Sequence, residues 1–238
     1  MKIIADLHTH TLVSEHAYST VDEMVNSAKE KGFLALAITD HGPASSDGAK
    51  SVHFRAMHSL PKYINDVRLL RGCEANIIDY NGKLDLSEKV LNYLDFVIAS
   101  YHEDVISPHT KEEHTKGYAE VIKNPNIDCL GHVGNPKFEF DIEYIVKLCK
   151  EYNKLIEINS SSFTIRKGSF PICRDVALCC KKYETNIVVT SDAHSKYKVG
   201  DHKDAIELLS SIDFPEHLIL NTDYDKLMNY IKNNAIKL

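Results

Sequence analysis

Apolar runs of strand length alternate with amphipathic stretches of helical spacing along the whole chain. The apolar runs predict seven strands, over residues 3–7, 33–38, 67–74, 96–100, 127–130, 155–158 and 187–190. The amphipathic stretches predict helices over 20–31, 111–123, 141–152, 172–183, 203–209 and 224–233, with a small hairpin over 77–86 and a short helix at or near His53 and His58. Thr20 and Glu23 have the spacing of a capping box, which sets the start of the first helix, and Gly32 ends it.

Strands that are separated by helices indicate a parallel sheet, and about seven such units favour a closed barrel. An open, doubly wound sheet is the alternative, but it normally carries a glycine-rich phosphate loop after its first strand. This chain has a His-Thr-His sequence there instead. No linker or repeat divides the sequence, so we expect one domain over residues 1–238, folded as a distorted (β/α)7 TIM-like barrel.

Composition excludes several classes of protein. Hydrophobic residues make up 43% and charged residues 26% of the 238 residues, as in ordinary soluble domains. The net charge is −6 without a Lys/Arg-rich tract, which argues against nucleic acid as the main partner. No apolar stretch reaches the length of a membrane span, and the amino terminus does not resemble a signal peptide. Six cysteines without a Cys-x-x-Cys pair indicate buried free thiols, so we expect a cytoplasmic protein.

Residues that can bind metal follow nearly every predicted strand. They are His8, His10, His16, His41, Glu74, His102, His132, Asp192 and His194. His8 and His10 are two residues apart at a strand end, so their side chains project from one face. In a parallel barrel the carboxyl ends of the strands converge on one rim, where such enzymes keep their chemistry. Each histidine alone has an ordinary structural explanation, but seven histidines and two carboxylates at one structural place favour a metal cluster.

Nine ligands are too many for one ion, because zinc usually takes about four. They suit two or three ions, with a carboxylate able to bridge. Imidazole and carboxylate ligands without cysteine fit Zn²⁺ first, with Mn²⁺ and Fe²⁺ as alternatives. The other six histidines lie away from strand ends and are expected to be ordinary, with His109 the one that could still face the pocket.

The motifs around these residues resemble those of the PHP superfamily (polymerase and histidinol phosphatase). The resemblance rests on residues 6–10, 39–43, 72–74, 131–132 and 191–194, together with His102. Residues 14–20, 71–77 and 159–169 are similar more narrowly to the YcdX-like phosphatases. The resemblance covers essentially the whole chain and implies a distorted seven-stranded barrel with a trinuclear zinc centre.

The resemblance also implies which residues share an ion. One ion would be held by His8, His10, Glu74 and Asp192, a second by Glu74, His102 and His132, and a third by His16, His41 and His194. Glu74 would bridge the first two ions. Spacing alone could not make these assignments.

The expected reaction is hydrolysis of a phosphate monoester by a metal-bound hydroxide, which bound zinc makes available near neutral pH. Asp6 and Asp40 could orient ligand imidazoles, or simply cap strand ends. Arg166 and Lys167 could clamp the phosphate of a small substrate, or be solvated loop charges. Asn159 could contact substrate or a metal-bound water.

Three other functions fit the same residues. Two are enzymatic: histidinol-phosphate phosphatase, and phosphodiesterase or exonuclease activity. The third is a metal-binding module without catalysis. Relatives can assemble as homo-oligomers, although no feature of this sequence marks an interface.

Overall fold

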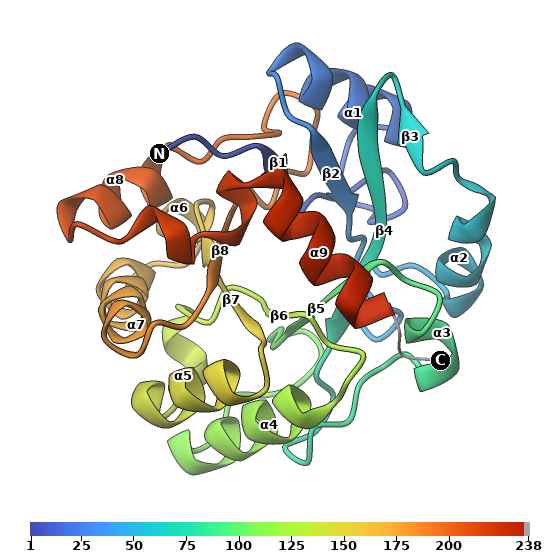
Figure 1. Ribbon diagram of the computed structural model, residues 1–238. Coiled ribbons are helices and arrows are strands. Elements are labelled where there is room, and N and C mark those ends of the chain that lie inside the picture. Colours follow the sequence, from blue (N-terminus) through green and yellow to red (C-terminus); the bar gives the residue numbers. More distant parts are fainter. Residues whose placement is uncertain (236–238) are drawn as a thin grey trace.

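The computed structural model describes residues 1–235. Over this range, seven parallel strands form one curved sheet with helices around its outside (Figure 1). In sheet order they are β1 (Ala5–Asp6), β2 (Ala35–Ile38), β4 (Val67–Asn76), β5 (Phe96–Ser100), β6 (Cys129–Leu130), β7 (Leu155–Asn159) and β8 (Ile187–Thr190). An eighth strand, β3 (Tyr63–Ile64), pairs antiparallel with β4. The predicted barrel-like α/β fold is therefore confirmed.

The helices occupy the predicted segments, with two additions. They are α1 (Val21–Glu30), α2 (Ser51–Ala56), α3 (Glu88–Leu91), α4 (Lys111–Lys123), α5 (Ile142–Glu151), α6 (Ser162–Ile165), α7 (Ser169–Tyr183), α8 (Lys203–Ser211) and α9 (Tyr224–Ala235). The capping box of α1 is present, because Thr20 accepts from the Glu23 backbone while Glu23 accepts from the Thr20 backbone. The short elements α3 and α6 were not predicted, since four residues carry no helical periodicity.

Helix α9 closes the amino-terminal mouth of the barrel and leaves the other mouth for the site. It lies across the barrel in Figure 1. Its residues Leu227, Tyr230 and Ile231 join a buried apolar cluster with residues near the strand starts, such as Ala35 and Phe96. Burial of this apolar surface fixes α9 against the barrel. The carboxyl ends of the strands then form the open rim.

Strands β1 and β8 do not form a regular ladder, so the barrel closes by other means. At the rim, the His10 backbone N–H donates to the Ala193 carbonyl at 2.8 Å. Deeper in the barrel, the fully buried Asn221 side chain spans the gap. Its amide donates to the carbonyls of Ala5 (2.8 Å) and Val189 (2.7 Å) and accepts from the Val189 N–H (3.1 Å). One side chain thus replaces the missing strand-to-strand hydrogen bonds.

Candidate metal centre

The nine predicted ligand residues lie together at the carboxyl-terminal rim. His8 and His10 follow β1, His41 follows β2, and Glu74 lies within β4 near its end. The others are His16 in the first loop, His102 after β5, His132 after β6, and Asp192 and His194 after β8. Parallel strands bring these distant residues together because all their carboxyl ends point to one mouth. That the nine bind metal stays a prediction.

Four donor atoms converge at one point in the interior of this rim. His8 Nε2 lies 3.2 Å from Glu74 Oε2 and 3.5 Å from Asp192 Oδ1. His10 Nε2 lies 3.6 Å and 3.2 Å from the same two oxygens. All four atoms are buried without a hydrogen-bond partner. A tetrahedral zinc ion with bonds of about 2.0–2.1 Å holds its ligand atoms about 3.3–3.4 Å apart, and the four nitrogen-to-oxygen distances lie close to that value.

The other oxygen of Glu74 faces a second group of donors. Glu74 Oε1 lies 2.7 Å from His132 Nε2 and 3.2 Å from His102 Nε2. The two imidazole nitrogens are 3.1 Å apart. Because the two carboxylate oxygens face different imidazoles, Glu74 has the placement of a ligand that bridges two ions.

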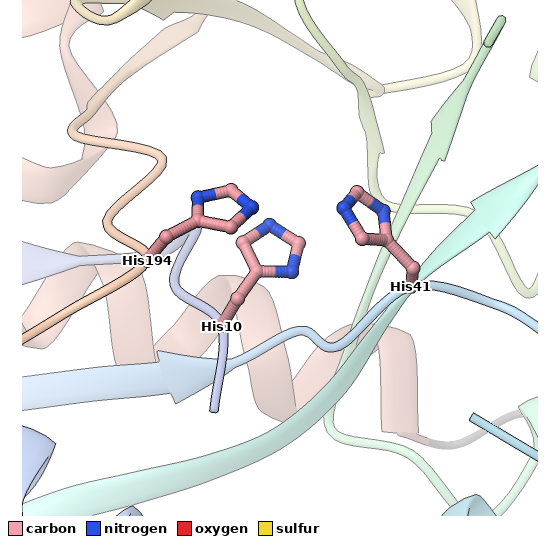
Figure 2. Close-up of side chains that lie close together, drawn as sticks. All are labelled: His10, His41 and His194. Atoms are coloured by element: carbon pink, nitrogen blue, oxygen red, sulfur yellow. The ribbon is translucent and has the colours of Figure 1, made fainter. Parts of the chain in front are cut away.

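The third group is looser and closer to solvent. The His16 ring centroid lies 4.2 Å from that of His194 and 5.3 Å from that of His41. Figure 2 shows His10 and His194 side by side, with His41, which follows the neighbouring strand β2, on the other side of His10. His41 Nδ1 lies 2.9 Å from Glu74 Oε2, so this ring also reaches toward the first group. The three predicted sites share one continuous cluster.

Charge in the cluster acts differently on different candidate ligands: burial lowers the pKa of His8 and His41, but nearby carboxylates outweigh it and raise both. Burial alone would raise the pKa of Glu74, but the imidazoles of His8, His102 and His41 outweigh it and hold that pKa well below its usual range. Burial and the neighbouring His41 lower the pKa of His10 to about 3. Burial, with Arg166 nearby, lowers the pKa of His132 to about 4. Neutral imidazoles and ionised carboxylates are the forms that bind metal.

Two of these residues have a left-handed backbone. Asp192 has φ of 55° and His132 has φ of 27°. Non-glycine residues with positive φ are uncommon and cluster at functional sites, where the surrounding structure holds them. Here the conformation lets Asp192 and His132 turn their side chains into the mouth directly after a strand.

Two buried residues that the sequence reasoning did not select hold the histidines in place. Glu157, in β7, accepts from His8 Nδ1 at 2.6 Å and from Thr190 Oγ1 at 2.6 Å. Asn76, at the end of β4, accepts from His102 Nδ1 at 2.6 Å. Such acceptors fix the ring orientation and leave Nε2 free for a metal. A glutamate inside the apolar run 155–158 was the available signal for Glu157, since a buried carboxylate needs partners.

Asp6 and Asp40, expected either to orient ligand imidazoles or to cap strand ends, accept hydrogen bonds from the loops of the rim. Asp6 accepts from the backbone N–H groups of Ser191 (3.1 Å) and Gly200 (2.8 Å). Asp40 accepts from the Thr11 N–H at 2.7 Å and from Ser14 Oγ at 2.9 Å. Each carboxylate thus ties a rim loop to a strand end.

The residues expected to contact the substrate or a metal-bound water differ in where the structure places them. Arg166 lines a pocket of about 290 Å³ beside the cluster, with Nη1 3.7 Å from Asp192 Oδ2. Lys167 is exposed and lines neither of the two pockets at this rim. Asn159 is buried and donates to Asp192 Oδ2 at 3.1 Å, so it holds a candidate ligand. His109 also lies outside the site, since it is exposed and pairs with Glu113.

Comparison with known proteins agrees with this geometry. The family model for the PHP domain matches residues 6–161. The chain belongs to the PHP domain family. A protein of Acetivibrio thermocellus named probable phosphatase is 47% identical over 238 residues, covering 100% of this chain and 99% of that protein. Another probable phosphatase, from Clostridium botulinum strain Langeland, is 44% identical over 235 residues, covering 99% and 97%.

Solved structures show the same PHP fold. Histidinol phosphate phosphatase from Lactococcus lactis, in complex with zinc, L-histidinol and phosphate, aligns with a TM-score of 0.65 at 18% identity, over 89% of this chain and 94% of that one. A protein of Listeria monocytogenes named putative histidinol phosphatase aligns with a TM-score of 0.58 at 20% identity, over 84% of this chain and 99% of that one. Within residues 1–235, no helix is both long enough and apolar enough to cross a bilayer.

Proposed function

We propose that this PHP-family chain is a metal-dependent phosphatase that hydrolyses phosphate monoesters with three divalent ions, zinc being the first choice. One observation carries the proposal: the buried, unpartnered Nε2 atoms of His8 and His10 each lie 3.2–3.6 Å from one carboxylate oxygen of Glu74 and one of Asp192. Buried polar atoms without partners are costly, so a bound cation is the natural partner of this set. The probable phosphatases among its relatives support the reaction class.

The chain's own residues fix the donors before any ligand arrives. Glu157 and Asn76 hold the rings of His8 and His102 by their Nδ1 atoms. Asn159 holds the Asp192 carboxylate. When bound, divalent ions in such a site lower the pKa of a coordinated water and neutralise charge on a phosphoryl oxygen. Because these donors are already held in place, little free energy is needed to reorganise them during the reaction.

Arg166 is the cation best placed for the substrate's phosphoryl group. Its guanidinium lines the same pocket as His16, His41 and Asp192 and hydrogen-bonds Ser162 Oγ at 3.1 Å. A guanidinium can bind two phosphate oxygens in parallel, which orients the group as well as binding it. A second pocket of about 380 Å³ adjoins it, and we assign the organic part of the substrate to this space.

The test counts metal and measures turnover on the same sample. We expect three ions per chain and hydrolysis of an aryl phosphate monoester that stops with a strong chelator and returns with Zn²⁺. Faster hydrolysis of bis-aryl phosphate diesters would move the assignment to phosphodiesterase. Tightly bound metal without turnover of either ester would indicate a metal-binding module without catalytic activity. Absence of bound metal would refute the proposal.

A further inference from the structure

Asp47 lies against His16 at the outer edge of the cluster, although nothing in the sequence pattern marked it. Its Oδ2 pairs with His16 Nδ1. The His16, His41 and Asp47 side chains each offer a donor atom within 4.8 Å of the other two. Asp47 is therefore either a direct ligand or a residue that acts through His16.

The rest of the cluster indicates which of the two roles fits. Three other histidines have Nδ1 bound to an acceptor of the protein: His8 to Glu157 (2.6 Å), His102 to Asn76 (2.6 Å) and His194 to the Asp192 carbonyl (2.9 Å). A protonated Nδ1 leaves Nε2 as the ring nitrogen with a free lone pair. His16 with Asp47 repeats this arrangement.

His16 is also the ring that most needs an orienting partner. Its side chain is 51% exposed, compared with 25% for His194 and 10% for His41. The neighbouring protein therefore limits its rotation less than it limits that of His194 or His41. A carboxylate at Nδ1 limits that rotation and fixes the tautomer.

Asp47 itself is held in place from several sides. Ser45 Oγ lies 2.9 Å from Asp47 Oδ1 and 2.8 Å from Asp104 Oδ2. The Asp47 carbonyl accepts from the Glu15 N–H at 3.2 Å, which joins its loop to the loop of His16. The carboxylate is thus anchored to the loop it orients.

We propose that Asp47 is a positioning residue of the third ion: it binds the Nδ1–H of His16 and leaves Nε2 for a metal shared with His41 and His194. This inference rests on the proposed function, because it assumes that the third group binds an ion. It assigns to Asp47 no contact with the ion or the substrate.

The experiment measures zinc binding, not turnover, in the full chain. Loss of such a carboxylate partner typically costs about 10–100-fold in metal affinity. We expect Asp47→Ala to lose about that factor for one of three ions in a titration against a chromophoric chelator, with the other two unchanged. Asp47→Asn should recover part of the loss, because its amide oxygen can still accept from Nδ1. The matched control is Glu113→Ala, which removes a carboxylate from the Nδ1 of the exposed His109.

Nitrogen chemical shifts decide between the two roles of Asp47. In ¹⁵N-labelled, zinc-loaded wild type we expect His16 with a protonated Nδ1 and a metal-bound Nε2. A metal-bound Nδ1 would overturn the positioning role, and so would three ions of unaltered affinity in Asp47→Ala. If wild type binds three ions while Asp47→Ala is unchanged, only this inference fails. If wild type binds no metal, the proposed function fails with it.

Discussion

Asn221 offers a direct test of how the barrel is closed. Replacing it by alanine removes three side-chain hydrogen bonds. Their partners, the Ala5 carbonyl and both backbone groups of Val189, are then left unpaired. Asn221 is 0% exposed, so water does not readily take its place. The backbone bond from the Ile4 N–H to the Asn221 carbonyl, 2.9 Å, remains.

The size of the effect follows from the number of bonds. A buried polar group left without a partner costs about 1–3 kcal/mol, and a net hydrogen bond is worth about 1 kcal/mol. Three groups left unpaired therefore predict a loss of at least about 3 kcal/mol from a folding free energy of about 5–15 kcal/mol. For a chain of this length, that loss corresponds to a fall of about 6–12 °C in Tm.

Urea denaturation of the metal-free protein measures this loss without a contribution from bound ions. The control is Thr222→Ala, because Thr222 is the next residue and its hydroxyl bonds only nearby carbonyls, at 2.8 Å to Ile219 and 3.5 Å to Glu216. We expect the control to lose less than about 1 kcal/mol, the value of a single net hydrogen bond. A similarly small loss in Asn221→Ala, with an unchanged m-value, would show that Asn221 does not close the barrel.

Three further predictions concern the site and the charged core. Glu74→Gln should lose both ions that its carboxylate bridges and most of the turnover, while unchanged zinc content by elemental analysis would rule out the bridge. Arg166→Ala should raise KM for an aryl phosphate by about 10–100-fold, which corresponds to the loss of a hydrogen bond to a charged group. Lys167→Ala should leave KM unaltered, and equal effects of the two substitutions would refute the role of Arg166 as a phosphate clamp. The Asp95 carboxyl is partly buried, which raises its pKa, but hydrogen bonds from Arg71 at 2.8 and 3.0 Å outweigh this and hold the pKa below its usual value. The stability that ionised Asp95 contributes is therefore present above its unfolded pKa and is lost as pH falls through its folded pKa. We expect the free energy of unfolding to fall less steeply with decreasing pH in Asp95→Asn than in wild type.

The sequence could predict those elements whose pattern is local. Strands β5 and β8 and helix α4 have the predicted bounds, because each is a continuous apolar or amphipathic run between turn residues. Strand β3 has two residues, Tyr63 and Ile64, and pairs only with β4, so it carries no period to detect. Strands β1 and β6 are shorter than predicted, since a ladder extends only where a neighbour pairs in register.

The same distinction applies to the site. The candidate ligands lie at or just after strand ends, and the carboxyl ends of parallel strands meet at one rim. The order of strands and ligands along the chain was therefore enough to predict that these residues lie together. The partners of their rings were not, because the pairing of His8 with Glu157 spans 149 residues. Such a contact depends on the neighbouring strands and the pleat, which a single sequence does not display.

The buried donor atoms at the rim destabilise the metal-free fold. Glu74 Oε2 and Asp192 Oδ1 are buried without a hydrogen-bond partner, and Asp192 also has a left-handed backbone. Such groups oppose folding, so the apolar barrel beneath them and α9 across its other mouth must supply the stability that holds them. Under the proposed function, an ion that binds these atoms only in the folded chain relieves the cost and stabilises the native state by mass action. The features that make this rim costly without metal are therefore the ones that would give it affinity for metal.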